Sequence, residues 1–245
     1  EPTPGQGEVL VKVAKVGVCG SDVHYYYAGS IGIHVVKEPI ILGHECAGEV
    51  VGLGPGAEHR KVGDRVVIEP GVPCGKCGFC REGNYNICQK MHFMATPPVN
   101  GAFCEYVAWP EAWCYAMPDR MTYAEGAMIE PLAVGMWAAR RSGVTAGDTV
   151  AVLGAGPIGL TTLQAAIAHG AARAIVTDLV PMRLEVAARL GATETIDASQ
   201  EDAETAIMEL TGGRGVDVAF ECAGAVPTLQ MALRIARNGG VAQLV

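Results

Sequence analysis

The sequence predicts an α/β protein in which a β-rich half precedes a doubly wound parallel sheet. Short β-like runs separated by glycine and proline fill the first half, whereas after about Tyr123 compact apolar runs alternate with alanine-rich helical stretches. The pattern G-x-G-x-x-G also follows one of these apolar runs and opens a helical stretch. At 245 residues, 50% of them hydrophobic, the chain can form one large domain or two ordinary ones.

The first half is expected to consist mainly of strands and loops. Residues 9–18, VLVKVAKVGV, alternate apolar and polar positions over part of their length, as a half-buried strand does. Further β-like runs are CAGEVVGLG, DRVVIEP and CEYVAWP, with glycine and proline between them. Helical periodicity is weak here, and the most polar loop carries a cluster of cysteines.

Strands and helices are expected to alternate along the second half. The strands are residues 149–153, 174–178, 192–197, 216–222 and 239–245, and the helices are residues 158–169, 182–190, 201–211 and 226–237. This alternation implies βαβ units and a parallel sheet covered on both faces. We therefore assign residues 1–122 to one domain and residues 123–245 to the other. A doubly wound dinucleotide fold typically has about six strands. Because the chain ends within its fifth, we expect it to be C-terminally truncated.

Charge and cysteine content restrict the partners and the compartment. A formal net charge of −8 without a block of lysine and arginine disfavours nucleic acid and acidic lipid as partners. No segment has the roughly 18 uninterrupted apolar residues of a membrane span, and the first residues lack a leader pattern. The nine cysteines are odd in number, and some have the spacing of metal ligands. We expect a cytoplasmic protein with reduced thiols and no nucleic-acid or membrane partner.

A glycine loop lies where the first strand of the second half meets a helix. Gly154 would permit the tight turn, Gly156 would let a pyrophosphate approach the backbone, and Gly159 would let helix and strand pack closely. The diphosphate would lie at the helix N-terminus, where free N–H groups favour negative charge. We predict that these glycines and Ile158 bind a dinucleotide, although glycine-rich turns also occur for packing alone.

Asp178 ends the next predicted strand, about 20 residues after the loop. An acidic side chain there can accept hydrogen bonds from the adenosine ribose hydroxyls, although a strand-terminal aspartate can also simply begin a turn. The same acid would repel a 2′-phosphate, so NAD is favoured. Arg183 lies nearby in the sequence and keeps NADP open.

The most local metal motif is C-x2-C-x2-C-x7-C, formed by Cys74, Cys77, Cys80 and Cys88. Four thiolates in one loop satisfy a closed tetrahedral zinc site and leave no position for substrate, so the site is expected to be structural. An iron–sulfur run begins in the same way but closes with C-x3-C-P, which this loop does not. A disulfide pair is a third alternative.

A second, dispersed group consists of Cys19, His44 and Glu45. One sulfur, one nitrogen and one oxygen would suit a catalytic zinc with an open position. Spacing alone does not join these residues, because each has an ordinary alternative. Cys19 can be a small buried side chain, His44 a hydrogen-bonded loop residue, and Glu45 a surface charge.

Taken together, several stretches resemble the zinc-dependent medium-chain dehydrogenases, and most closely their sorbitol (polyol) dehydrogenase branch. The stretches are GVCGSDVHYY, GHECAGEVVGLG, VGDRVVIEPGVPCGKCGFCREGNYNIC, ATPP, EGAMIEPLAVG and VLGAGPIGL, and they extend over essentially the whole chain. The resemblance implies a GroES-like catalytic domain followed by a Rossmann domain, with the active site in the cleft between them.

The resemblance also implies roles for individual residues. Cys19, His44 and Glu45 resemble the catalytic zinc ligands, and Glu130 resembles an additional acid that reaches the metal directly or through water. Alcohol dehydrogenases of this superfamily usually have a cysteine as third ligand, whereas this branch and this chain have the glutamate. Asp22 resembles the carboxylate that orients the ligating histidine.

Four further residues of the first half resemble groups around the substrate. Ser21 and His24 resemble the relay that carries the substrate proton to solvent, and Tyr25 and Phe93 resemble residues that line the polyol pocket. Either aromatic could equally be a core residue. The cysteine cluster resembles the family's structural zinc site, which implies two zinc ions per chain.

The implied activity is hydride transfer from a secondary alcohol of a polyol, of the sorbitol or xylitol type, to NAD, which gives a ketose. The alternatives are a dehydrogenase for threonine, butanediol or another secondary alcohol, and a dinucleotide-binding protein without catalysis. The expected partners are a small-molecule polyol and, in a homo-oligomer, further copies of the chain.

Overall fold

The computed structural model describes residues 1–245 and separates them into two units, Glu1–Glu130 and Pro131–Val245. The sequence predicted the boundary after residue 122, a few residues earlier. Residues 123–130 stay with the first unit because Tyr123 and Ile129 pack against a small cluster of Ala47, Val67 and Met117.

The first unit is built on an antiparallel sheet with the strand order β8-β1-β4-β5-β9. Its strands are β1 (Glu8–Gly17), β2 (Ser30–Ile31), β3 (His34–Val35), β4 (Glu45–Leu53), β5 (Arg65–Ile68), β6 (Gly71–Val72), β7 (His92–Phe93), β8 (Tyr106–Pro110) and β9 (Cys114–Ala116). Its helices are α1 (Gly20–Ala28), α2 (Gly78–Arg81), the 3-10 turns η1 (Tyr85–Ile87) and η2 (Glu111–Trp113), and α3 (Tyr123–Ala127). The expectation of a β-rich first half is confirmed.

Alternate residues of β1 and its neighbours form the core of the first unit. Val9 and Val11 are fully buried and pack with Val50, Val66 and Trp109. β1 pairs antiparallel with β4 over nearly its whole length. This pairing brings the end of β1 next to the start of β4, where two of the predicted ligands lie.

Helix α1 was not predicted from the sequence. Its residues GSDVHYYYA lack an apolar stripe, and only Asp22 and Tyr25 are buried. Cys19 is the residue that precedes the helix, and Gly29 ends it in the left-handed conformation with φ of 68°. The helix therefore depends on its ends and its surroundings more than on periodicity.

The second unit is a parallel sheet with the strand order β12-β11-β10-β13-β14. Its strands are β10 (Thr149–Leu153), β11 (Arg173–Asp178), β12 (Glu194–Asp197), β13 (Val216–Glu221) and β14 (Ala236–Leu244). Its helices are α4 (Ile129–Ser142), which begins at the unit boundary, α5 (Pro157–Ala168), α6 (Pro181–Arg189), α7 (Ala203–Leu210) and α8 (Val226–Ile235). The predicted doubly wound sheet is confirmed.

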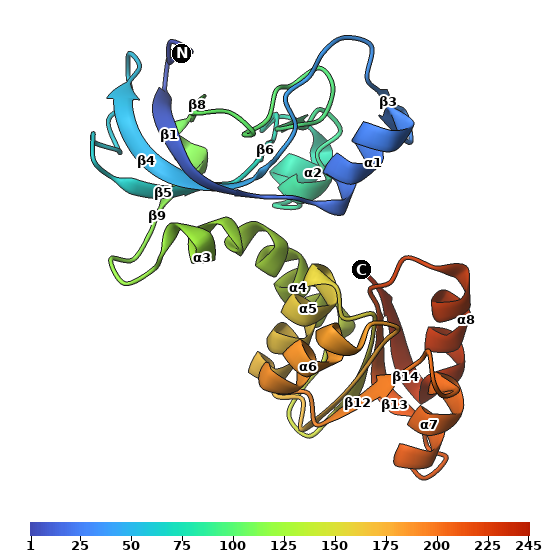
Figure 1. The fold of residues 1–245 in the computed structure, drawn as a ribbon. Helices are drawn as coiled ribbons and strands as arrows, with labels where there is room; N and C mark the ends of the chain where they lie inside the picture. The colour runs from blue at the N-terminus through green and yellow to red at the C-terminus, as the bar shows by residue number, and fades with distance from the viewer. The chain divides into compact units, whose positions relative to one another are not determined.

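Helices cover both faces of this sheet (Figure 1), and a separate hydrophobic core lies on each face. Val150 and Val152 of β10 face the core formed with α4, α5 and α6, whereas Ala151 and Leu153 face the core formed with α7 and α8. Successive residues of a strand thus point to opposite faces of the sheet, and both faces are buried.

The observed helices lie close to the predicted positions but differ at some boundaries. α8 ends at Ile235 and β14 begins at Ala236, where the sequence had predicted helix to residue 237 and strand only from residue 239. α4 is the longest helix, with 14 residues. No helix in the structure combines the length and the apolar character needed to cross a membrane.

Candidate metal centres and dinucleotide site

The structure brings Cys19, His44 and Glu45 together in the first unit. Their ligand atoms, one sulfur, one nitrogen and one oxygen, all lie within 4.8 Å of one another, and the histidine and glutamate are buried. This donor set suits zinc, and three protein ligands leave a coordination position for another molecule. The residues therefore fit a catalytic type of zinc site.

The pairing of β1 with β4 explains how this triad forms. Glu45 is the first residue of β4 and lies opposite Gly17 at the end of β1. A β-carbon at Gly17 would lie 2.1 Å from Glu45 Oε2, so a larger residue there would displace the carboxylate from this position. Cys19 follows two residues later, and the strand pairing therefore delivers the sulfur to the carboxylate.

Asp22 connects the two segments that carry the triad. One carboxylate oxygen accepts the N–H of Cys19 at 2.9 Å, and the other accepts the N–H of Gly43 at 2.8 Å. The nearest ring nitrogen of His44 is 4.0 Å from Asp22, which is too long for a hydrogen bond. The carboxylate therefore acts on the backbone around the histidine, and its orienting role toward the imidazole stays a prediction.

The titratable groups of the triad disfavour negative charge in the absence of a cation. Burial raises the pKa of the Cys19 thiol, and a hydrogen bond with Ser21 opposes this shift. Burial also raises the pKa of Glu45 and of Glu130, and the two carboxyls repel each other. A divalent cation would stabilise the ionised forms of Cys19, Glu45 and Glu130.

Glu130 and the two residues of the predicted proton relay differ in their contacts with the triad. Glu130 is outside the tight group of ligand atoms, although its charge acts on Cys19 and Glu45. Ser21 is half-buried on α1 beside Cys19. His24 is exposed on the same helix, and no hydrogen bond joins it to Ser21.

The two predicted pocket aromatics differ in their surroundings. The Phe93 ring packs edge-on against the imidazole of His44, with 5.6 Å between the ring centroids. Tyr25 is only 7% exposed on α1. Phe93 therefore lies in the immediate surroundings of the triad, whereas Tyr25 is largely a buried residue of its helix.

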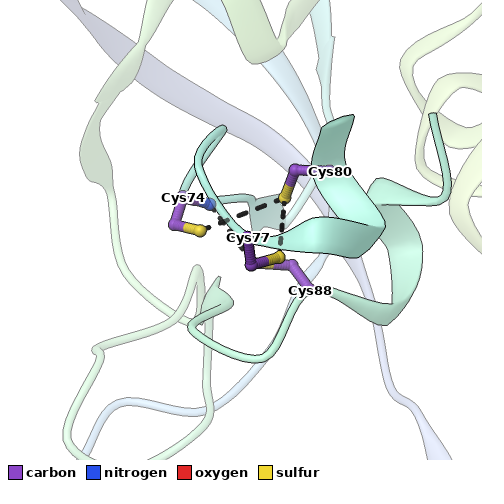
Figure 2. Close-up of side chains that lie close together, drawn as sticks. All are labelled: Cys74, Cys77, Cys80 and Cys88. Atoms are coloured by element: carbon purple, nitrogen blue, oxygen red, sulfur yellow. Dashed lines mark hydrogen bonds between the residues drawn. The ribbon is translucent and has the colours of Figure 1, made fainter. Parts of the chain in front are cut away.

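The cysteine cluster forms a second compact group in the first unit (Figure 2). The sulfur atoms of Cys77 and Cys80 are 3.4 Å apart, those of Cys77 and Cys88 3.9 Å, and those of Cys74 and Cys80 4.0 Å. Zinc–sulfur bonds of about 2.3 Å in a tetrahedron place sulfur atoms about 3.8 Å apart. All nine cysteines of the chain are free thiols, so the geometry fits a closed metal site and not a disulfide.

Backbone N–H groups point at the sulfurs of this cluster. Cys88 Sγ accepts the N–H of Cys74 at 3.3 Å and that of Lys90 at 3.4 Å. Backbone hydrogen bonds lower the pKa of Cys77 to about 6, whereas burial raises the pKa of Cys80 to about 12. The loop is thus partly organised to hold thiolates, as metal ligation requires.

The glycine loop of the second unit has the predicted geometry. Gly154 has φ of 98°, in the left-handed region, and it links β10 to the loop. A β-carbon at Gly159 would lie 1.8 Å from the carbonyl oxygen of Gly154, whereas one at Gly156 would meet nothing within 4 Å. Ile158 is half-buried in the first turn of α5. The loop therefore leaves the helix N-terminus open to a phosphate group.

Asp178 supports this loop in a way that sequence reasoning missed. Its Oδ2 accepts the N–H of Ala155 at 2.7 Å, and its Oδ1 accepts the N–H of Val180 at 2.9 Å. Arg183 on α6 lies 3.6 Å from the same carboxylate, which is only 8% exposed. The acid is at the predicted place, and it also ties the end of β11 to the glycine loop.

Sequence reasoning missed two other supporting groups. The segment Asn100–Phe103 runs along the loop before His44 and hydrogen-bonds to it. Glu221, at the end of β13, accepts the N–H groups of Ala223 and Gly224 next to the glycine loop. The pair Asn100-Gly101 is a turn signal, but nothing in the sequence indicates its partner.

Comparison with known proteins identifies the family. The model of the alcohol dehydrogenase GroES-like domain matches residues 5–119, and that of the zinc-binding dehydrogenase matches residues 157–245. A sorbitol dehydrogenase of Bacillus subtilis (strain 168) is 50% identical over 244 residues, which are 100% of this chain and 69% of that protein.

Solved structures agree with this assignment. The 2R,3R-butanediol dehydrogenase of Bacillus subtilis superposes with a TM-score of 0.88 at 40% identity, over 100% of this chain and 72% of that one. A zinc-binding dehydrogenase of Sinorhizobium meliloti 1021 with bound NADP superposes with a TM-score of 0.93 at 35% identity, over 99% of this chain and 70% of that one. With its GroES-like and zinc-binding dehydrogenase regions and this identity to a sorbitol dehydrogenase, the chain belongs to the zinc-dependent medium-chain dehydrogenases, in their sorbitol dehydrogenase branch.

Proposed function

We propose that this protein is a zinc- and NAD-dependent polyol dehydrogenase that oxidises a secondary alcohol of a sugar alcohol to a ketose. The observation that supports this most directly is the convergence of Cys19, His44 and Glu45, one sulfur, one nitrogen and one oxygen, in a chain that is 50% identical to a sorbitol dehydrogenase. Such a set leaves a coordination position for a hydroxyl group.

As a member of this family the chain is an oxidoreductase that uses zinc and a nicotinamide dinucleotide. We infer that the dinucleotide is NAD. The Asp178 carboxylate lies at the end of β11, beside the glycine loop, where it would repel a 2′-phosphate. Arg183, 3.6 Å from that carboxylate, offsets part of this repulsion, and the similar dehydrogenase of Sinorhizobium meliloti binds NADP.

The residues of the first unit suggest how the reaction proceeds. Cys19, His44 and Glu45 would hold a zinc ion, with Glu130 as an additional acidic residue close to them. When bound, zinc lowers the pKa of a substrate hydroxyl and the nicotinamide ring accepts a hydride from the substrate carbon. Ser21, next to Cys19, would accept the hydroxyl proton as it gives up its own, and the exposed His24 would receive that proton and release it to solvent.

The pocket and the cysteine cluster would have supporting roles. Phe93 packs on His44 and would limit one side of the substrate site, and Tyr25, a largely buried residue of α1, would contribute to the pocket from that helix. The four cysteines would hold a second zinc with no open position, which would stabilise their loop.

We also infer, from the sequence alone, that the protein forms a homo-oligomer and is located in the cytoplasm.

Metal content and a substrate panel test the proposal. The encoded polypeptide that contains residues 1–245, purified with zinc, should hold two zinc ions per chain. It should reduce NAD with sorbitol or xylitol faster than with threonine or butanediol. A zinc-loaded protein that oxidises butanediol or threonine but no polyol would refute the proposed substrate class.

A pair of variants assigns the activity to the triad. Glu45→Gln removes the proposed oxygen ligand and should abolish turnover while the cysteine cluster keeps its zinc. Glu49→Gln is the matched control, because Glu49 is an exposed acid on the same strand, β4. If Glu45→Gln retains both zinc ions and full activity, Glu45 is not a ligand.

A further inference from the structure

The loop that carries His44 has no secondary structure of its own. Residues 36–44 lie between β3 and β4 and form neither helix nor strand. Buried backbone groups of such a loop need hydrogen-bond partners, because an unpaired buried N–H or C=O is costly. The partners therefore indicate what fixes the position of the histidine.

Most of these partners come from one distant segment, Asn100–Phe103. The carbonyl oxygens of Ile41, Leu42 and Gly43 accept the N–H groups of Gly101 at 2.7 Å, Phe103 at 2.9 Å and Ala102 at 2.7 Å, respectively. The side chain of Asn100 adds a bond at the exposed end of this contact, where its Oδ1 accepts the N–H of Ile41 at 3.0 Å. Three consecutive carbonyls before His44 are thus fixed by one segment.

Close steric contact makes this arrangement specific. A β-carbon at Gly101 would lie 2.4 Å from the carbonyl oxygen of Gly43, so only glycine can approach this closely. Gly43 itself has φ of 86°, and a β-carbon there would lie 2.6 Å from the Phe103 ring. The phenyl ring therefore lies directly against the α-carbon of the residue that precedes His44.

Phe103 is in an unusual environment for an aromatic residue. It is 40% exposed, whereas its neighbour Ala102 is fully buried. A half-exposed ring contributes less to a core than a buried one. Its contact with Gly43 is the feature that distinguishes it, because any rotation of the Gly43 backbone would change the direction in which His44 leaves the loop.

We propose that Asn100 and Phe103 are positioning residues for the proposed catalytic metal site, and that they act by fixing the backbone of Ile41–Gly43. This inference rests on the proposed metal role of Cys19, His44 and Glu45. The residues do not touch the metal or the substrate. They hold the histidine at the distance from Cys19 at which one ion can bind both.

Metal affinity and the cobalt spectrum test this inference in the encoded full-length polypeptide. The cysteine cluster is kept loaded with zinc, the open site is exchanged to Co²⁺ by dialysis, and affinity is measured by competition with a chelator. We expect Phe103→Ala and Asn100→Ala each to weaken metal binding at the triad by about 10- to 100-fold and to shift the visible cobalt bands. Zinc at the cysteine cluster reports that the unit is still folded.

Conservative variants and a matched control separate positioning from general stability. Phe103→Tyr keeps the ring and Asn100→Asp keeps an acceptor for the Ile41 N–H, so both should restore affinity and spectrum. Phe79→Ala removes a ring of similar exposure, 37%, from the cysteine loop and should leave the triad's cobalt spectrum unchanged.

The metal affinity and the cobalt spectrum of these variants decide between positioning and general stability. If the wild-type protein binds two ions and both alanine variants keep the wild-type affinity and spectrum, this inference alone is wrong. It is also wrong if the alanine variants only lower the melting temperature, or if Phe79→Ala has the same effect on the triad. A wild-type protein that binds metal only at its cysteines would refute the proposed function and this inference together.

Discussion

Asp22 Oδ1 accepts the N–H of Gly43 at 2.8 Å, and this bond joins the helix that follows Cys19 to the loop that precedes His44. The other oxygen of the same carboxylate accepts the N–H of Cys19. One buried side chain therefore sets the relative position of two proposed ligands that are far apart in the sequence. It does so through hydrogen bonds to backbone N–H groups.

Replacing Asp22 should weaken the proposed catalytic metal site selectively. Asp22→Ala leaves two N–H groups without their acceptor and frees both ligand segments, so we expect a loss of about 10- to 100-fold in metal affinity at the triad. Zinc analysis after dialysis against a chelator should then find about one ion per chain instead of two. Asp64→Ala, which removes an aspartate from an exposed turn of the same unit, is the control. Retention of two ions by Asp22→Ala would contradict the prediction.

Substitutions of two glycines in the dinucleotide loop should impair different properties, one of them NAD binding and the other stability. Gly156 has an open environment and φ of −70°, so Gly156→Val should fold normally. Its side chain would occupy the space in which a pyrophosphate approaches the backbone, and NAD binding should weaken by at least about tenfold. Gly159→Ala would place a methyl group against the Gly154 carbonyl and should lower the free energy of unfolding by about 1–3 kcal/mol.

Dinucleotide titration by fluorescence and thermal unfolding without ligand separate these two effects. Gly156→Val should show lost binding with an unchanged melting temperature, and Gly159→Ala a lowered melting temperature. Normal NAD affinity in Gly156→Val would mean that the pyrophosphate does not bind at this loop.

Local motifs were predictable from the sequence, and contacts between distant loops were not. The four cysteines lie within one loop, so their spacing alone indicated a tetrahedral site. The glycine loop was equally local, because strand, turn and helix follow one another directly. In both cases the residues that meet in space are neighbours in the chain.

The triad needed more than spacing. Cys19 meets Glu45 only because β1 pairs with β4 in one register, and the residues between them show no periodicity that fixes this pairing. Cys19, His44 and Glu45 could be grouped only because the motifs around them resemble those of the zinc-dependent medium-chain dehydrogenases. The contacts of Asp22 and Asn100 with the loop before His44 had no sequence signal, since both join backbone groups of irregular segments.

A buried ion-pair group in the second unit makes stability depend on pH. Asp217 accepts hydrogen bonds from Arg214 at 2.7 Å, from Arg237 at 2.5 Å and from the N–H of Thr149 at 2.9 Å. The Arg214 guanidinium, with Arg237, holds the pKa of this carboxyl well below its ordinary 3.8. Because the folded-state pKa is lowered, the stabilisation is fully present above 3.8 and is lost as the pH falls toward the lowered value.

Asp217→Asn should therefore lower the free energy of unfolding at neutral pH by about 1.5 kcal/mol. This value is at the lower end of the range for charged hydrogen bonds because Arg214 is half exposed and solvent screens its charge. The difference from wild type should shrink in urea unfolding at about pH 3. Glu204→Gln breaks the exposed pair with Arg234 and should cost less than about 1 kcal/mol. A difference that stays constant from neutral to acidic pH would contradict the assigned ion pair.

The position of Asp178 predicts how cofactor preference can be changed. The carboxylate has two tasks, since it accepts the Ala155 N–H and places a negative charge beside the proposed ribose site. Asp178→Asn keeps an oxygen that can accept the Ala155 N–H, but it removes the charge and turns an amide NH2 group toward the Val180 N–H in place of its acceptor. NAD affinity should therefore fall only modestly while NADP affinity rises, because Arg183 is no longer neutralised by a carboxylate 3.6 Å away.

Asp178→Ala removes both functions and should weaken the binding of both dinucleotides by destabilising the glycine loop. Dissociation constants for NAD and NADP, measured side by side, distinguish the two variants. If Asp178→Asn lowers the affinity for both dinucleotides as strongly as Asp178→Ala, the charge does not set the preference and support of the loop is the main role of this residue.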